Sequence, residues 1–244
     1  MTILVTGGTG NIGSALARLL QAANYSLIVA SPPISGDALE QTKPFFKVAI
    51  GRGVKRFVLI TATQAEKGDN SQYGKVHEHL ANLGVEYTVL RPTWFIVTGK
   101  GRIPFVSVQD IAKAAFDALT AEKSANTDYF VIGPELWSYD DVSTRISFLV
   151  ILPEVTDETT FTQVAAALRE ITGRKIVHRL ISLEEQLASF KLWMDEEYAI
   201  ELNTYEGRIA SGIEEKNVGH PKAIPGKRKS RDYLEANKEL WTKA

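Results

Sequence analysis

Three glycines near the start of the chain have the spacing of a loop that approaches a diphosphate. Gly7, Gly10 and Gly13 stand between an apolar segment, residues 2–6, and residues 11–20, whose apolar side chains recur at helical spacing. Gly7 would allow a tight turn with positive φ, Gly10 would let a pyrophosphate come close, and Gly13 would let the helix pack on the strand. The alternative is an ordinary strand-to-helix turn. The residues expected to bind a cofactor here are Gly7, Thr9, Gly10, Asn11, Ile12 and Gly13.

Two hydroxyl residues stand where further strands of such a fold would end. Residues 25–30 form an apolar run that ends before Ser31, and residues 55–60 form another that ends before Thr61. The end of the second strand meets the adenine ribose, where an acid favours a free 2′-hydroxyl and a base favours a 2′-phosphate. Ser31 is neither, and two prolines follow it, so the choice between NAD and NADP stays open at this position. Thr61 would either face the cofactor or cap its strand, and both residues are kept as candidate cofactor ligands.

The composition excludes several classes of protein. The chain has 244 residues, a net charge of -1 and no cysteine, with 44% hydrophobic and 23% charged residues. These values are typical of a globular protein and give no reason to expect a nucleic-acid or membrane partner. Without cysteine there is no thiolate or disulfide chemistry, and the four histidines do not form a zinc-binding spacing. We therefore expect a cytoplasmic protein without a metal, and the oligomeric state stays open.

Strand-like and helical segments alternate over the first part of the chain. This alternation predicts an α/β fold, a Rossmann-type doubly wound parallel sheet, over residues 1–140. From residue 141 to residue 244 the alternation weakens, and a mainly helical substrate-side region is expected. Ser182 and Glu185 have the spacing of a capping box, and residues 196–210 have a helical pattern.

The predicted sheet is too short for a complete doubly wound half. Between Ser31 and Asp37 there is room only for a turn, although a further strand and its crossover helix need a dozen residues or more. The segment from Trp94 to Gly99 is similarly brief, whereas residues 146–158 form an apolar insertion in a helical region. We therefore expect a sheet that lacks one or two strands, either because the protein is divergent or because its splice boundaries are misplaced.

Several motifs resemble those of a known family, in the same order along the chain. They are the opening glycine turn, residues 57–60 (FVLI), 87–93 (YTVLRPT), 105–112 (FVSVQDIA) and 132–135 (IGPE). Together they resemble the NmrA-like branch of the atypical short-chain dehydrogenases. Within that branch the chain is similar to the fungal ergot-alkaloid reductases, festuclavine synthase and agroclavine dehydrogenase. The resemblance implies NADPH-dependent reduction of a cyclic iminium, formed from chanoclavine-I aldehyde, to a clavine alkaloid, with NADP as cofactor and a small alkaloid as substrate.

Two residues are candidates for the proton chemistry of such a reaction. Most short-chain dehydrogenases use a Tyr and a Lys four residues later, but here Tyr73 is followed at that spacing by His77, and Lys75 comes two residues after Tyr73. Residues four apart share a helix face, and a histidine titrates near neutrality, so the pair is chemically reasonable. The alternative is a helix with ordinary polar residues.

Two aromatic residues are candidates for contacts with the substrate. Trp94 and Phe95 follow a predicted strand and would wall an apolar tricyclic substrate by stacking, or would simply pack in the core. Because the Tyr-Lys pair is incomplete, a second function is also open: an NmrA-like redox sensor that binds NAD(P) without catalysis.

Overall fold

The computed structural model describes most of the chain in two compact units. The described residues are 2–30, 38–93, 102–138 and 181–229, with 159–160, 166, 169–171, 173, 175, 232 and 235–236. The first unit comprises residues 1–92, 108–131 and 221–226, and the second comprises residues 93–107, 132–220 and 227–244. Most of residues 139–180 lie outside the described part, so the domain boundary expected near residue 140 stays a prediction.

The first unit has parallel strands, as the sequence predicts. One parallel pair joins β1 to β2, with Ile3 opposite Leu27. In a second sheet β4 is parallel to both β3 and β6, and β9 follows β6. The strands are β1 (Thr2–Thr6), β2 (Ser26–Ala30), β3 (Arg56–Ile60), β4 (Glu86–Pro92), β6 (Thr127–Ile132) and β9 (Ala223–Pro225).

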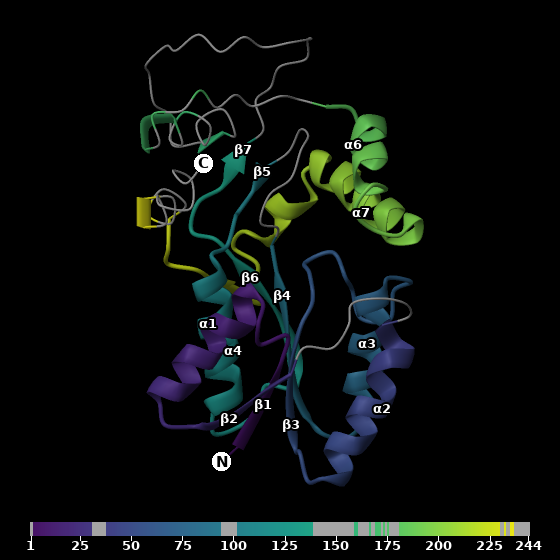
Figure 1. Cartoon of the computed structure of the whole chain (residues 1–244), viewed down its shortest axis with the longest axis vertical. Coiled ribbons are helices and arrows are strands. Elements are labelled where there is room, and N and C mark those ends of the chain that lie inside the picture. The colour runs from purple at the N-terminus through teal and green to yellow at the C-terminus, as the bar shows by residue number, and fades with distance from the viewer. Residues whose placement is uncertain are drawn as a thin grey trace. The chain divides into compact units, whose positions relative to one another are not determined.

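Helices flank these strands on two sides. The helices are α1 (Asn11–Ala22), α2 (Ala38–Gly51), α3 (Gln72–Ala81) and α4 (Val108–Thr120). Figure 1 shows α1 and α4 on one side of the strands and α2 and α3 on the other, and α1 packs against α4. The core under α2 and α3 contains Phe46, Phe57, Val76, Leu80 and Val89, all buried. The layers are those of a Rossmann-like fold.

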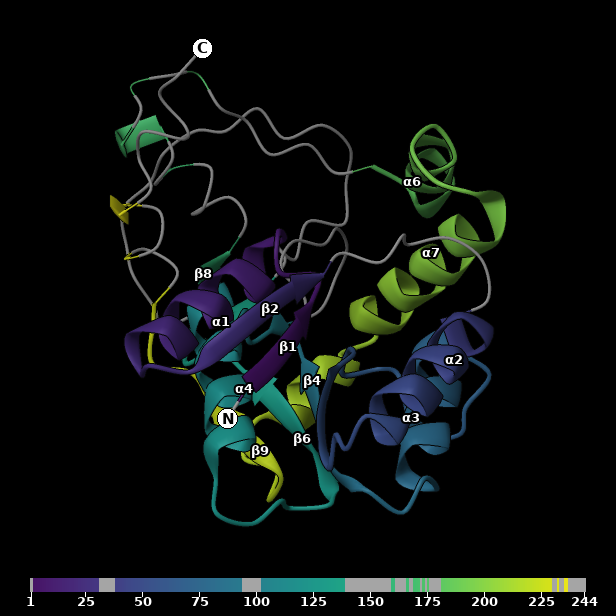
Figure 2. The ribbon, with the colours of Figure 1, turned by 60° about the horizontal axis from the view of Figure 1, so that its bottom comes forward.

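The sheet is interrupted where the sequence predicts missing strands. Among the described residues, no hydrogen bond joins the β1–β2 pair (Figure 2) to the sheet that contains β3. Only residues 31–37 separate β2 from α2, and α2 leads directly into β3. Residues along β1 alternate between exposed and buried, and Leu4 is 41% exposed. A strand inside a parallel sheet is normally covered on both faces, so β1 lacks its usual cover.

The second unit holds short strands and helices. β5 (Arg102–Ile103) is antiparallel to β7 (Trp137–Ser138), and β7 is parallel to β8 (Thr159–Thr160). The helices are α6 (Leu183–Phe190), α7 (Glu196–Ala210) and the 3₁₀ helix η1 (Ile213–Asn217). Ser182 and Glu185 form the predicted capping box at the start of α6, and α7 has the predicted bounds. Buried Ile103 and Ile209 form a small core with Phe105 and Ile213.

Candidate dinucleotide site

The glycine turn between β1 and α1 has the predicted conformation. Gly7 has a φ of 65°, in the left-handed region that favours glycine. The N–H of Gly10 donates to the carbonyl of Gly7 at 3.0 Å, and the N–H of Ser14 donates to the carbonyl of Gly10 at 2.9 Å. Gly10 is extended, with φ −78° and ψ 173°, and is the N-cap of α1. The chain therefore reverses tightly and enters the helix without an intervening loop.

Gly13 and Gly10 have different steric surroundings. A Cβ atom on Gly13 would lie 2.2 Å from the carbonyl oxygen of Gly7 and 2.7 Å from the Cα of Gly8. No side chain fits there, so Gly13 is what allows α1 to pack on the turn, as expected. A Cβ atom on Gly10 would meet only the Gly7 oxygen within 4 Å, at 3.3 Å. Among the described residues, no other atom outside the chain neighbours lies within 4 Å of that position.

The N-terminus of α1 is open to an anion. No side chain caps it by a hydrogen bond, and its first turn contains no acidic residue. Gly7, Thr9, Gly10 and Asn11 are exposed, Ile12 is half-buried and Gly13 is buried. The first N–H groups of a helix have no partners within the helix, and the helix dipole favours negative charge there. The turn can thus hold a phosphate group through main-chain donors.

Thr61 lies just after β3, where its polar groups approach β4. Its N–H donates to the carbonyl of Leu90 at 2.8 Å, and its hydroxyl lies 3.5 Å from the same oxygen. The N–H of Thr63 in turn donates to the carbonyl of Pro92 at 3.1 Å. These contacts favour the strand-end capping that the sequence left open, and a contact between Thr61 and a cofactor stays a prediction.

A buried arginine holds the loop after β3, and sequence reasoning missed it. Arg91 is 5% exposed, and its guanidinium donates to the carbonyl of Thr63 and, at 2.9 Å, to Asp128. Its guanidinium carbon also lies 4.6 Å from the centre of the Phe130 ring. The Nζ of Lys222 lies 2.7 Å from the other carboxylate oxygen of Asp128. The one signal in the sequence is a charged residue that directly follows the apolar residues Val89 and Leu90 near the end of β4.

The two cations hold Asp128 in its charged form. Burial by itself raises the pKa of Asp128, but hydrogen bonds from Lys222 and Arg91 outweigh burial and lower the pKa from 3.8 to about 2. A lowered folded-state pKa contributes stability above the unfolded value, and that contribution is lost as the pH falls toward the folded value. The shift corresponds to about 2 kcal/mol at neutral pH.

We predict that Asp128→Asn lowers the free energy of unfolding by about 2 to 4 kcal/mol at pH 7, because it also removes the nearer of two carboxylates from buried Arg91 and leaves, among the described residues, only Glu66, at 3.9 Å and largely exposed. Urea unfolding at pH 7 measures the loss, and at about pH 3 the difference from the parent chain shrinks. Asp117→Asn is the matched control, since Asp117 forms an exposed pair with Lys113 and should cost less than about 1 kcal/mol. Equal losses in the two variants would contradict the prediction.

Tyr73 and His77, the candidates for proton chemistry, lie one turn apart on α3. Tyr73 is 36% exposed, whereas His77 is 2% exposed and packs edge-on against Tyr87 with 6.4 Å between ring centres. The Nδ1 atom of His77 has no hydrogen-bond partner among the described residues. Burial lowers the pKa of His77, although the nearby Asp128 carboxylate acts in the opposite direction. His77 is therefore held neutral, and its catalytic role stays a prediction.

Three of the predicted site residues lie outside the described residues: Ser31, Trp94 and Phe95. Across the described part of the chain, no group of three or more His, Asp or Glu side chains is placed to hold a metal ion. No helix there is long and apolar enough to cross a membrane.

The chain matches known NAD-dependent proteins in sequence. Residues 3–87 match the NAD dependent epimerase/dehydratase family. Festuclavine synthase I of Penicillium roqueforti is 31% identical, with 99% of this chain and 100% of the relative aligned. Agroclavine dehydrogenase of Claviceps fusiformis is 30% identical, with 99% of each chain aligned. The chain belongs to the NmrA-like branch of NAD(P)-binding oxidoreductases.

Solved structures agree with this family at the level of the fold. The NADPH-dependent quinone oxidoreductase QOR2 of Escherichia coli, in complex with NADPH, matches with a TM-score of 0.62 and 17% identity. That match covers 98% of this chain and 99% of the bacterial one. The relationship supports a Rossmann-like nucleotide-binding fold for this member of the family.

The chain is shorter than the relatives that it matches. The alignment with the Penicillium relative extends over 309 positions, but this chain has only 244 residues, so at least 65 positions of the relative have no counterpart here. Because the alignment includes nearly all of both chains, the missing positions are internal. A shortening of this size is compatible with the loss of strands that the sequence predicts.

Proposed function

We propose that this protein is an NADPH-dependent oxidoreductase that reduces a cyclic iminium of an indole alkaloid to a clavine such as agroclavine or festuclavine. The observation that carries the proposal is the 30–32% identity to festuclavine and agroclavine enzymes over 99% of the chain. The main-chain N–H groups at the start of α1, from Asn11 onward, would bind the pyrophosphate of the cofactor.

The reaction asks little acid catalysis of the protein. Bound NADPH would supply a hydride to the iminium carbon, which would become an amine carbon and leave NADP⁺. The iminium carbon is already electrophilic, so the protein mainly binds and orients the two molecules. Tyr73, whose side chain is partly exposed, would act near the substrate. His77, whose lowered pKa favours the neutral form, would support Tyr73 from the buried face of α3. Trp94 and Phe95 would stack on the tricyclic ring system.

NADP is proposed rather than NAD for two reasons. The E. coli relative in fold was solved with NADPH. In this chain Ser31, at the expected ribose position, provides no carboxylate to repel a 2′-phosphate.

A second candidate function is an NmrA-like sensor that binds NAD(P) without turnover. The break between β1 and β3 favours it, because catalysis needs nicotinamide and substrate held more tightly than binding alone does. The two functions share the glycine turn and differ only in turnover.

Gly10→Val tests the shared part of the two proposals. The backbone angles of Gly10 suit any residue, so the turn should survive, but the valine side chain would fill the space beside it. We expect the dissociation constant for NADPH, measured by titration calorimetry, to rise about 100-fold, or ~2.7 kcal/mol, with the melting temperature nearly unchanged. An unaltered affinity for NADPH would show that the pyrophosphate does not bind at this turn.

Turnover separates the enzyme from the sensor. Oxidation of NADPH is followed at 340 nm with a cyclic iminium substrate, with Gly10→Val as the inactive control. Steady oxidation that requires the iminium supports the reductase, whereas NADPH binding without oxidation supports the sensor. In the same assay Tyr73→Phe should lower kcat by about 10-fold, because the hydroxyl would orient the iminium against the nicotinamide, and should leave KM for NADPH unchanged.

A further inference from the structure

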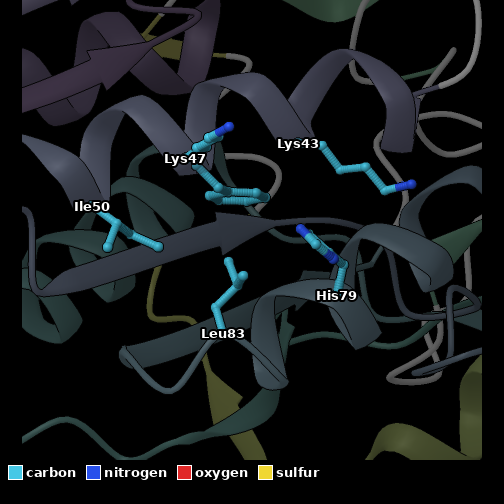
Figure 3. A pocket seen from close by; sticks show the side chains of 6 residues that line it. Lys43, Lys47, Ile50, His79 and Leu83 are labelled. Carbon is cyan, nitrogen blue, oxygen red and sulfur yellow. The ribbon is translucent and has the colours of Figure 1, made fainter.

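A pocket of about 430 Å³ lies between α2 and α3, on the opposite side of the strands from α1 and its glycine turn (Figures 1 and 3). Its volume is within the range of small-molecule sites. The proposed reductase function makes no use of it. The residues that line it are Lys43, Phe46, Lys47, Ile50, His79 and Leu83.

The pocket has an apolar floor. Phe46 is buried and is held edge-on to Phe57, with 5.3 Å between the ring centres. Ile50 and Leu83 are half-buried and extend the apolar surface from α2 and from the turn after α3. Because Phe46 is fixed by the core beneath it, the floor keeps its shape when the pocket is empty.

One end of the pocket is basic. Figure 3 shows the side chains of Lys43 and His79 at one end and those of Ile50 and Leu83 toward the other. Lys47 is exposed on α2, and the ring of His79 lies 6.0 Å from that of Phe46. None of the lining residues is acidic, and the one carboxylate paired with Lys43, that of Glu40, is 65% exposed on the same helix. The site therefore combines an apolar surface with net positive charge.

We infer that this pocket binds an amphipathic organic anion, an aromatic carboxylate of about two fused rings. The flat ring system lies on Phe46, Ile50 and Leu83, and the carboxylate meets the ammonium group of Lys43 at the end where His79 lies. Apolar contact supplies most of the affinity, and the charge at one end selects the carboxylate over a neutral compound. The site is separate from the dinucleotide turn, so an aromatic acid and NADPH bind at the same time.

The test uses 2-naphthoate as the probe and neutral 2-naphthalenemethanol as its matched control. By titration calorimetry at pH 7.5 and low salt, 2-naphthoate should bind once per chain, at least about 10-fold more tightly than the neutral compound. Lys43→Glu should weaken the binding of 2-naphthoate at least about 10-fold. Lys113→Glu should not, because Lys113 is an exposed residue of α4 that does not line the pocket. NADPH, titrated in parallel, should bind equally well with and without the probe.

Four results would overturn the inference. Equal binding of 2-naphthoate and the neutral alcohol would show that charge does not select the ligand. Equal binding of 2-naphthoate to the two lysine variants would show that it binds outside this pocket. Competition between 2-naphthoate and NADPH would indicate that 2-naphthoate binds at the dinucleotide turn. A dimer seen by sedimentation that excludes 2-naphthoate would show that a second copy covers this face. Failure of NADPH to bind, with 2-naphthoate still bound, would count against the proposed function alone.

Discussion

Replacement of residues 31–37 by a natural strand and crossover helix from a complete Rossmann-type sheet is expected to tighten NADPH binding at least about 10-fold and to raise the melting temperature by about 5–10 °C. In this chain the β1–β2 pair has no hydrogen bonds to the β3 sheet among the described residues. A dinucleotide lies across the carboxyl ends of several neighbouring parallel strands. When the strands on the two sides of β1 are not in one sheet, the two halves of the cofactor site are not held in a fixed geometry.

The exposed face of β1 is the reason to expect a higher melting temperature. Leu4 is 41% exposed, and a restored strand with its crossover helix would cover it and the neighbouring backbone. Burial of one leucine contributes about 1.5–3 kcal/mol, and ladder hydrogen bonds on both edges of the new strand would add cooperativity. NADPH calorimetry and thermal unfolding by circular dichroism measure the two effects.

A segment of equal length made of glycine and serine is the control for this exchange. It restores the length of the chain without adding an apolar strand, so it should raise neither the affinity for NADPH nor the melting temperature. If the natural and the glycine-serine segments behave alike, the break in the sheet does not limit cofactor binding.

Gly13→Ala is expected to abolish NADPH binding and to lower the free energy of unfolding by about 2–4 kcal/mol. The added Cβ atom would lie 2.2 Å from the oxygen of Gly7 and 2.7 Å from its carbonyl carbon, distances that require main-chain movement. To relieve this overlap α1 must move away from the turn, which disturbs both its packing and the donors at its N-terminus. Overpacking in a core costs about 1–3 kcal/mol, and here the clash is with backbone rather than with a flexible side chain.

Gly51→Ala is the matched control for this substitution. Gly51 is at the end of α2, and a Cβ atom there would meet nothing within 4 Å. A glycine-to-alanine change at such a position is neutral or slightly stabilising. Fluorescence titration measures the affinity of both variants for NADPH, and urea unfolding measures their stability. Wild-type behaviour of Gly13→Ala would show that α1 does not pack on the turn.

The parts of the fold predicted from the sequence are those set by local rules. The positive φ of Gly7 and the close packing at Gly13 follow from the spacing of the glycines, and both are confirmed. The interruption of the sheet was predictable for a different reason: the seven positions from residue 31 to residue 37 are too few for a strand and a crossover helix, and this limit is one of covalent geometry.

The parts missed depend on which strands become neighbours. Arg91 and Asp128 are far apart in the sequence, and their pairing requires β4 beside β6 in one register. Spacing within α3 placed Tyr73 and His77 on one face, but it did not show that His77 would be 2% exposed against Tyr87 while Tyr73 stays in solvent. That difference is set by the sheet beneath the helix. Trp94 and Phe95 stay predictions.

The bare face of β1 has a consequence for the protein inside a cell. An apolar strand that pairs along only one edge, as β1 does among the described residues, is the kind of surface that folding chaperones retain and proteases remove. We therefore expect the steady-state amount of this protein to respond strongly to the supply of nucleotide, since a ligand that binds only the folded form withdraws the chain from degradation.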